Sequence, residues 1–281
     1  MKEQEKREIA LRLRSYIRRQ GSQARAAKAM GIGAATVSAV LKEDWVSVSE
    51  EMLRKIDSHT RVSSEWTLVE TGVYREMTQV MDDARRDCDY TWIIGVPGCG
   101  KSCTAEDYAR RHPSTYYVLC SLDMGKREFI EALSRVVGIY KPEYNLYHAM
   151  REVVDKIRTR ESPLIILDEA EKLGNWFMSY FITLYNELEE MAGIVCLSSP
   201  QIKTRMQRGI ACNRRGYEET YSRLGRRFYE LDQTNVTDVT AICRANGVAS
   251  EADIHKIIRS TEQCNLDIRR VRKLVRKVLH A

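Results

Sequence analysis

The spacing of apolar residues alternates between helical and strand-like along this chain of 281 residues. Short, β-prone runs with almost no polar residue stand in its middle, separated by longer stretches of helical period. The runs are residues 90–94, 116–122, 163–167, 193–197 and 228–231. Apolar strands without alternation are typical of a parallel sheet covered on both faces. The pattern therefore predicts an α/β fold, a parallel sheet with helices on both faces.

Helical patterns account for most of the remaining chain. An extended segment followed by a helix occupies 66–87, and helices are predicted at 125–137 and 146–160. Three more helices follow the last strand, at 237–245, 250–259 and 265–279. The segment 201–227 is long and basic and contains few apolar residues.

The N-terminal stretch predicts a small helical domain. Helices are expected at 3–19, 23–30 and 34–41, and a fourth runs from a cap at Ser47 or Ser49 to Ile56. Two short helices of small residues around a glycine turn resemble the helix-turn-helix of phage repressors, with 36–41 as recognition helix. The alternative is a helical hairpin that contacts no nucleic acid. The polar stretch 57–64 is expected to be a linker.

The expected recognition helix indicates DNA binding with weak sequence preference. Base discrimination usually depends on Arg, Lys, Asn or Gln reaching purine edges, and the helix has none of these at its start. Hydroxyl and basic groups can instead bind phosphates, which position a protein without specifying sequence. The candidate DNA contacts of this domain are Arg25, Lys28, Thr36, Ser38 and Lys42.

The first strand leads into the sequence GVPGCGKS, which has the G-x-x-x-x-G-K-[ST] spacing of a P-loop. Its glycines let backbone N–H groups point inward, and the following helix adds its positive end, so that a phosphate is bound. Lys101 is expected on the β- and γ-phosphates and Ser102 on Mg²⁺. The candidate nucleotide contacts are Gly95, Pro97, Gly98, Cys99, Gly100, Lys101, Ser102 and Cys103.

Polar residues end the third and fourth predicted strands, where ligands bind in parallel sheets. Asp168 is the second candidate Mg²⁺ ligand, and Glu169 is the candidate general base for the attacking water. Ser199 is a candidate to orient that water beside the γ-phosphate. The alternatives are acidic residues that cap a helix and a Ser-Pro turn without a ligand contact.

The charge and cysteine content of the chain indicate a type of partner and a cellular compartment. The net charge is +6, and arginine pairs such as Arg18–Arg19 and Arg214–Arg215 suggest a polyanionic partner. The eight cysteines are scattered without a CxxC pair, which favours reduced thiols in a cytoplasmic protein over zinc or disulfides. No apolar stretch approaches the roughly 20 residues that span a bilayer, and the N-terminus lacks a signal-peptide core.

A P-loop, an Asp-Glu strand end, a polar strand end and arginines before a last strand resemble the AAA+ ATPases. This resemblance implies that one arginine acts on the ATP of a neighbouring subunit, with Arg223 the first choice, Arg226 the second and Arg227 a third. The final helices resemble the AAA+ lid, with Arg269 as its sensing arginine. Asn265 stands where the lid pattern has glycine. Arg223 or Arg226, the two main candidates to act on a neighbouring subunit, could instead be a surface or phosphate-binding residue.

The order of helix-turn-helix, leading helix, ATPase core and short basic lid resembles the transposition protein B family of phage Mu over essentially the whole chain. On this basis the chain is expected to contain a helix-turn-helix domain at 1–60, a linker and leading helix at 61–88, the AAA+ nucleotide-binding core at 89–233 and the helical lid at 234–281. It implies ATP-dependent filaments on double-stranded DNA, and a transposase partner that stimulates hydrolysis and receives the target DNA. For such a filament, the candidate DNA contacts in the core are Lys203, Arg205 and Arg208.

Two other functions remain open. A replication initiator or helicase loader also assembles on DNA, but usually reads an origin through base-contacting residues that are not evident here. A helix-turn-helix transcriptional regulator could use the P-loop domain as a nucleotide switch without turnover, although such a switch has no need of a base at Glu169.

Overall fold

The computed structural model describes residues 1, 3–20, 22–60 and 66–279, without the side chains of Ser15, Arg18, Arg19, Gln20 and Lys28. The contacts divide the chain into two compact units, Met1–Thr67 and Leu68–Ala281. None of the described helices combines the length and the apolar character that crossing a membrane requires.

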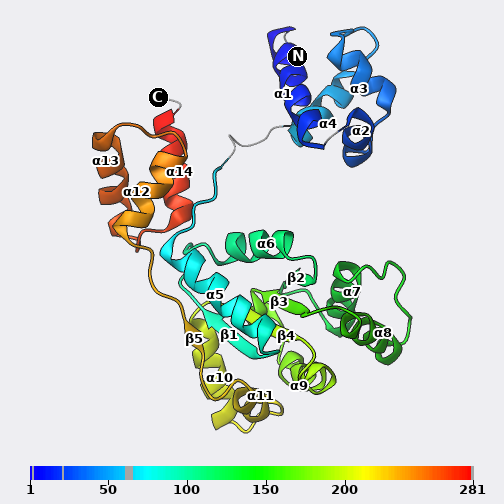
Figure 1. Cartoon of the computed structure of the whole chain (residues 1–281). Coiled ribbons are helices and arrows are strands. Elements are labelled where there is room, and N and C mark those ends of the chain that lie inside the picture. Colours follow the sequence, from blue (N-terminus) through cyan, green and yellow to red (C-terminus); the bar gives the residue numbers. More distant parts are fainter. Residues whose placement is uncertain (2, 21, 61–65, 280–281) are drawn as a thin grey trace. The chain divides into compact units, whose positions relative to one another are not determined.

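The first unit is a bundle of four helices (Figure 1). They are α1 (Glu3–Gln20), α2 (Gln23–Met30), α3 (Ala34–Leu41) and α4 (Glu50–Thr60). Their apolar faces meet in one core, which contains Ile9, Leu13, Ala26, Met30, Val37, Val40, Leu53 and Ile56. Gly31 turns the chain between α2 and α3 with φ 60°, a left-handed conformation that favours glycine.

The fourth helix is longer than predicted, because two polar residues of the expected linker are buried. Asp57 accepts a hydrogen bond from Arg12 at 2.8 Å, and Thr60 donates to the carbonyl of Ile56 at 2.7 Å. The expectation that the linker begins at residue 57 is therefore wrong. The rest of that stretch, up to residue 64, lies outside the described residues.

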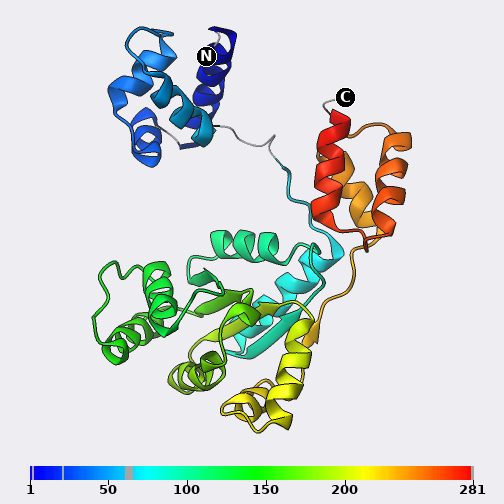
Figure 2. The same ribbon diagram turned by 180° about the vertical axis from the view of Figure 1, so that it is seen from behind.

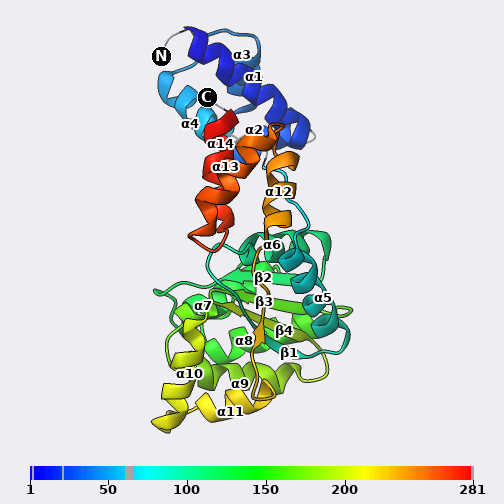
Figure 3. The ribbon, with the colours of Figure 1, turned by 90° about the vertical axis from the view of Figure 1, so that its left-hand side faces the viewer.

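The second unit is built on a five-stranded parallel sheet in the order β2-β3-β4-β1-β5 (Figures 1 and 3). The strands are β1 (Tyr90–Ile94), β2 (Thr115–Leu119), β3 (Leu164–Asp168), β4 (Gly193–Ser198) and β5 (Tyr229–Glu230). All five predicted strands are present, and the α/β fold is confirmed. The second strand ends at Leu119 rather than at residue 122, and Leu122 is exposed.

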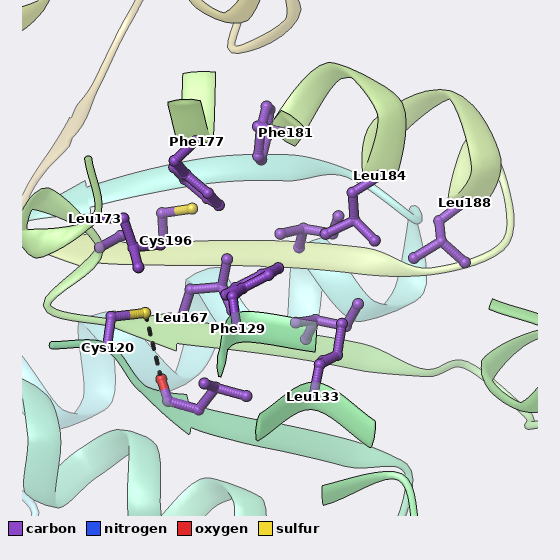
Figure 4. Close-up of a cluster of buried hydrophobic side chains, with 14 of the residues drawn as sticks. Cys120, Phe129, Leu133, Leu167, Leu173, Phe177, Phe181, Leu184, Leu188 and Cys196 are labelled. Atoms are coloured by element: carbon purple, nitrogen blue, oxygen red, sulfur yellow. Dashed lines mark hydrogen bonds between the residues drawn. The ribbon is translucent and has the colours of Figure 1, made fainter. Parts of the chain in front are cut away.

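Helices cover both faces of the sheet, so alternate strand residues enter different cores. On one face, Trp92 and Ile94 join a core with α7 (Lys126–Val136), α8 (Leu146–Arg158) and α9 (Trp176–Leu188); Figure 4 shows part of it. On the other face, Ile93 packs with α5 (Gly72–Arg86) and α6 (Lys101–Arg111). Burial on both faces explains why these strands show no polar alternation.

Most of the basic segment 201–227 is helical. It forms α10 (Gln201–Ala211) and α11 (Tyr217–Arg223), whose few apolar residues are spaced to face the core. Ile202, Met206 and Gly209 are buried along one side of α10, and a Cβ on Gly209 would lie 2.0 Å from the ring of Tyr217. The close approach of these two helices therefore requires glycine.

Three helices complete the unit after the sheet (Figures 2 and 3). They are α12 (Val236–Ala245), α13 (Glu251–Glu262) and α14 (Ile268–Leu279), and each packs against the other two. Val239, Ile257 and Val271 are among their buried residues. A capping box at the start of α12 joins Asn235 and Asp238, and Asp238 also accepts from the backbone N–H of Gly72 at 2.9 Å.

The docking of α5 on the sheet gives a stability prediction. A Cβ on Gly193, at the start of β4, would lie 2.3 Å from the carbonyl oxygen of Ala84 in α5. Gly193→Ala must therefore displace backbone, and we expect it to lower the free energy of unfolding by about 1–3 kcal/mol. Gly72→Ala is the matched control, since its Cβ would meet nothing closer than 3.7 Å. Denaturant unfolding of both variants measures the difference, and equal stabilities would contradict the close contact.

Candidate nucleotide-binding site

The P-loop connects β1 to α6 through a turn that requires glycine. Gly98 has φ 82° and Gly100 has φ 104°, and side chains other than hydrogen are strained in this region. The carbonyl of Gly100 accepts hydrogen bonds from the backbone N–H and the hydroxyl of Thr104, at 3.0 and 3.1 Å. The loop thus leads directly into the first turn of α6, whose free N–H groups and dipole favour an anion.

Lys101 folds back over the loop that precedes it. Its ammonium group donates to the carbonyls of Gly95 and Val96, at 2.7 and 3.1 Å. Cys99 is buried beneath it, and burial raises the pKa of the Cys99 thiol. A Cβ on Gly95 would lie 3.0 Å from the Cys99 sulfur, so this small side chain fills the interior of the loop.

Asp168 ends β3 as a buried carboxylate. Its Oδ2 accepts a hydrogen bond from the Tyr117 hydroxyl at 2.8 Å, and its Oδ1 accepts from the backbone N–H of Glu169 at 2.9 Å. Burial, and then the charge of Asp168, raise the pKa of Tyr117 well above that of a free phenol. The tyrosine is therefore a protonated donor to this carboxylate at any neutral pH.

Glu169, the predicted general base, is paired within the chain. It has φ 55°, a left-handed conformation uncommon for glutamate, and forms an ion pair with Lys172. The hydrogen bond to Glu169 is the largest cause of the raised pKa of Lys172. Both side chains are partly exposed, so water screens this pair.

The two serines at the end of β4 have different surroundings. The Ser198 hydroxyl is buried and accepts from Trp92 Nε1 at 2.8 Å. Ser199 is partly exposed, and its backbone N–H donates to Glu171 Oε1 at 2.9 Å. Ser199 therefore has the more accessible hydroxyl, at the strand end that adjoins β1 and its P-loop.

The oxygen donors suit Mg²⁺. Mg²⁺ commonly binds one or two carboxylates together with phosphate and water. Ser102 has a hydroxyl and Asp168 a carboxylate that could serve as such ligands. Within residues 1, 3–20, 22–60 and 66–279, no three His, Cys, Asp or Glu side chains gather as a metal cluster. A cation held by Ser102, Asp168 and nucleotide phosphates needs no such cluster.

The start of α14 contacts the P-loop directly. The N–H of Ile268 donates to the carbonyl of Gly98 at 3.0 Å, and a Cβ on Gly98 would lie 2.3 Å from the Asp267 carboxylate. Asp267 also caps the helix by accepting from the N–H of Arg269 at 2.7 Å. Asn265, in the place of the lid glycine, has φ 53°, which asparagine tolerates better than most residues. The Arg269 side chain is exposed in this first turn.

The three arginines proposed to act between subunits differ in their contacts. Arg223 donates to Asn186 at 3.2 Å and lies over the ring of Tyr185, 5.1 Å from its centroid. Arg226 forms an ion pair with Glu218 at 2.6 Å. Arg227 makes no hydrogen bond or ion pair to the part of the chain that the structure describes, and its side chain is exposed.

The predicted DNA contacts of α10 also differ. Arg205 donates to the carbonyls of Glu171 and Leu173, both at 2.8 Å, so its guanidinium joins α10 to the segment after β3. Lys203 pairs with Glu230 at 2.5 Å. Arg208 is exposed and lines a groove of about 540 Å³ together with Gln201, Thr204, Arg205 and Arg214.

The candidate DNA contacts of the first unit lie on α2 and on and after α3. Arg25 and Lys42 have exposed side chains, and Thr36 and Ser38 are half-buried. The side chain of Lys28 lies outside the described residues.

Three residues at the site were not predicted from the sequence. Tyr117, Glu171 and Lys172 contact Asp168, Ser199 and Glu169 respectively. Lys172 could have been found from its spacing three residues after Glu169. Tyr117 and Glu171 gave no local signal, because their contacts depend on how strands and loops pair.

The sequence of this unit is similar to known proteins. Residues 84–206 match the family model of an AAA domain. The Mu-like prophage FluMu DNA transposition protein B of Haemophilus influenzae is 22% identical over 256 residues, covering 85% of each chain. Residues 84–206 therefore form an AAA domain, in a chain distantly homologous to the transposition protein B of Mu-like prophages.

Proposed function

We propose that the protein binds and hydrolyses ATP, oligomerises on double-stranded DNA with little sequence preference, and presents that DNA to a transposase. The observation that carries the ATPase step is that a glycine-requiring P-loop follows β1 while Asp168 ends β3 and Glu169 follows it, at the same edge of the parallel sheet with only β4 between these strands. Homology to a DNA transposition protein supports the DNA and transposase steps.

Each site residue has a role in hydrolysis. The N–H groups at the start of α6 and the Lys101 ammonium bind the phosphates, which replace the loop carbonyls as partners of the lysine. Ser102 and Asp168 would hold Mg²⁺, which when bound would neutralise negative charge on the nucleotide phosphates. Glu169 accepts a proton from the attacking water, and Ser199 orients that water. Arg269 senses the nucleotide from the lid.

Glu169 can act as a base only after its contact with Lys172 loosens, since a nearby cation stabilises the carboxylate and reduces its basicity. The ion pair is partly exposed and therefore contributes little stability. Its release is compatible with a site that works only after subunits and DNA have assembled.

The first unit binds DNA mainly through phosphates. Helix α3 begins with Ala34, Ala35 and Thr36 and offers no long hydrogen-bonding side chain to base edges. Exposed Arg25 and Lys42 flank it and can contact the backbone. Such contacts fit a protein that covers DNA regardless of sequence.

Hydrolysis is tested by Glu169→Gln. Loss of the base should lower ATP turnover by about 10²–10⁴-fold while ATP affinity stays near that of the parent. Glu161→Gln, an exposed change before β3, is the control. Phosphate release and nucleotide binding are measured with DNA present. Unchanged turnover in Glu169→Gln would remove this residue as the base, and a parent that binds ATP without turnover would favour a nucleotide switch.

DNA contact in the ATPase unit is tested by Arg208→Ala. Removal of one phosphate contact should weaken binding equally to unrelated sequences and reduce the slope of log affinity against log salt by about 0.9. Gln207→Ala, an exposed neutral neighbour on α10, is the control. Arg205 is unsuitable for this test because its guanidinium joins α10 to the segment after β3. An unchanged salt slope would remove Arg208 from the DNA surface.

Action between subunits is tested by mixing variants. Arg223→Ala should lower turnover by about 10³-fold or more if this arginine completes a neighbour's site. Mixing it with Glu169→Gln should restore activity, because one subunit then supplies the arginine and the other an intact base. Arg226→Ala and Arg227→Ala are mixed with Glu169→Gln in the same way, and Glu218→Gln controls for loss of the Arg226–Glu218 ion pair. If no mixture restores activity, no finger among these arginines acts between subunits.

A further inference from the structure

Tyr117 and Asp168 come from adjacent parallel strands and lie on one face of the sheet. Asp168, the last residue of β3, is paired in register with Leu119, and Tyr117 stands two residues earlier in β2. Residues two apart in a strand point to the same face. That face carries α6, because Tyr117 packs against the core that includes Ala105 and Tyr108. The tyrosine thus lies on the side of the sheet from which Ser102 comes.

The Asp168 carboxylate has few partners for a buried charge. It is 1% exposed, and each oxygen accepts one hydrogen bond, from the Tyr117 hydroxyl and the Glu169 N–H. Among the described residues it forms no ion pair. A buried carboxylate without a cation is costly, so its two donors determine both its stability and its orientation.

The Tyr117 ring and hydroxyl have separate functions. The ring packs against apolar side chains, a contact that phenylalanine would preserve. The hydroxyl donates to Asp168 Oδ2 at 2.8 Å, and its removal would leave that oxygen without a donor. The hydroxyl is therefore not needed for packing the strand.

We propose that Tyr117 is a positioning residue for Mg²⁺: its hydroxyl fixes the Asp168 carboxylate in the orientation that binds the cation with nucleotide. The proposal rests on the ATP-binding function above. Side chains that hydrogen-bond a metal ligand orient it and set metal affinity, and their loss commonly weakens metal binding by about 10–100-fold. The effect should thus appear in the Mg²⁺ requirement rather than in nucleotide binding itself.

The chain offers a matched control. Tyr108 packs in the same core, and its hydroxyl donates to Asp82 at 2.6 Å, so it forms a second tyrosine–aspartate pair. Asp82 lies in α5, and neither it nor Tyr108 belongs to the phosphate or Mg²⁺ residues. Tyr108→Phe therefore reproduces the loss of a tyrosine–aspartate hydrogen bond without altering a Mg²⁺ ligand.

The experiment compares Tyr117→Phe, Tyr108→Phe and the parent as full chains. ATP affinity is measured in EDTA and across a Mg²⁺ titration, and the half-saturating Mg²⁺ concentration is also read from ATP turnover. We expect Tyr117→Phe to match the parent in EDTA but to need about 10-fold more Mg²⁺. Tyr108→Phe should show the parental Mg²⁺ dependence.

A double-mutant cycle separates positioning from a general packing effect. If Tyr117 acts through Asp168, Tyr117→Phe should have no further effect on the Mg²⁺ dependence in an Asp168→Asn background. A parental or lower Mg²⁺ requirement in Tyr117→Phe, or additive effects in the cycle, would overturn the proposal. A parent that binds no ATP with or without Mg²⁺ would instead refute the proposed ATPase function.

Discussion

The burial of one carboxylate at the end of an apolar strand constrains the rest of this site. Asp168 lies at the carboxyl edge of β3, where burial of a charge without hydrogen bonds would cost several kcal/mol. Two donors reduce that cost, the Tyr117 hydroxyl and the Glu169 N–H. The second donor belongs to Glu169, which itself adopts φ 55° directly after β3. The residue whose backbone stabilises the carboxylate is therefore also the proposed base.

A second link joins the phosphate loop to the C-terminal helices. The N–H of Ile268 donates to Gly98, and the Asp267 carboxylate packs on the same glycine. Both contacts depend on Asn265 and Leu266, whose φ angles of 53° redirect the chain into α14. Any change in the loop around bound phosphate must therefore act on the first turn of α14, where Arg269 lies. The contact is a physical link between the P-loop and the helices that follow the sheet.

The strands and the P-loop were predictable because their signals are local. Apolar runs identify buried strands, and glycine spacing identifies a turn that no other residue adopts easily. The helices α10 and α11 were harder to predict, since their helical pattern depends on Gly209 and Tyr217 packing against each other. The extension of α4 depends on Arg12, far away in sequence from Asp57. Tyr117 and Glu171 act through strand register and loop packing, which a single sequence does not specify.

The sequence also did not show which arginines are paired within the chain and which are exposed for contact with DNA or another subunit. Arg205 uses its guanidinium within the chain, whereas the neighbouring Arg208 is exposed. For Arg223 the question is energetic, because its contacts with Tyr185 and Asn186 must break before it can reach another subunit. Arg223 is half-buried, and its cation–π contact with Tyr185 and its hydrogen bonds to Asn186 and to the carbonyl of Glu219 together are worth about 2–3 kcal/mol. A 10³-fold rate effect corresponds to about 4 kcal/mol. The intrachain contacts of Arg223 are therefore too weak to prevent it from acting on a neighbour. Arg227 has no such contact to break among the described residues, so it would reach a neighbouring subunit at a lower energetic cost.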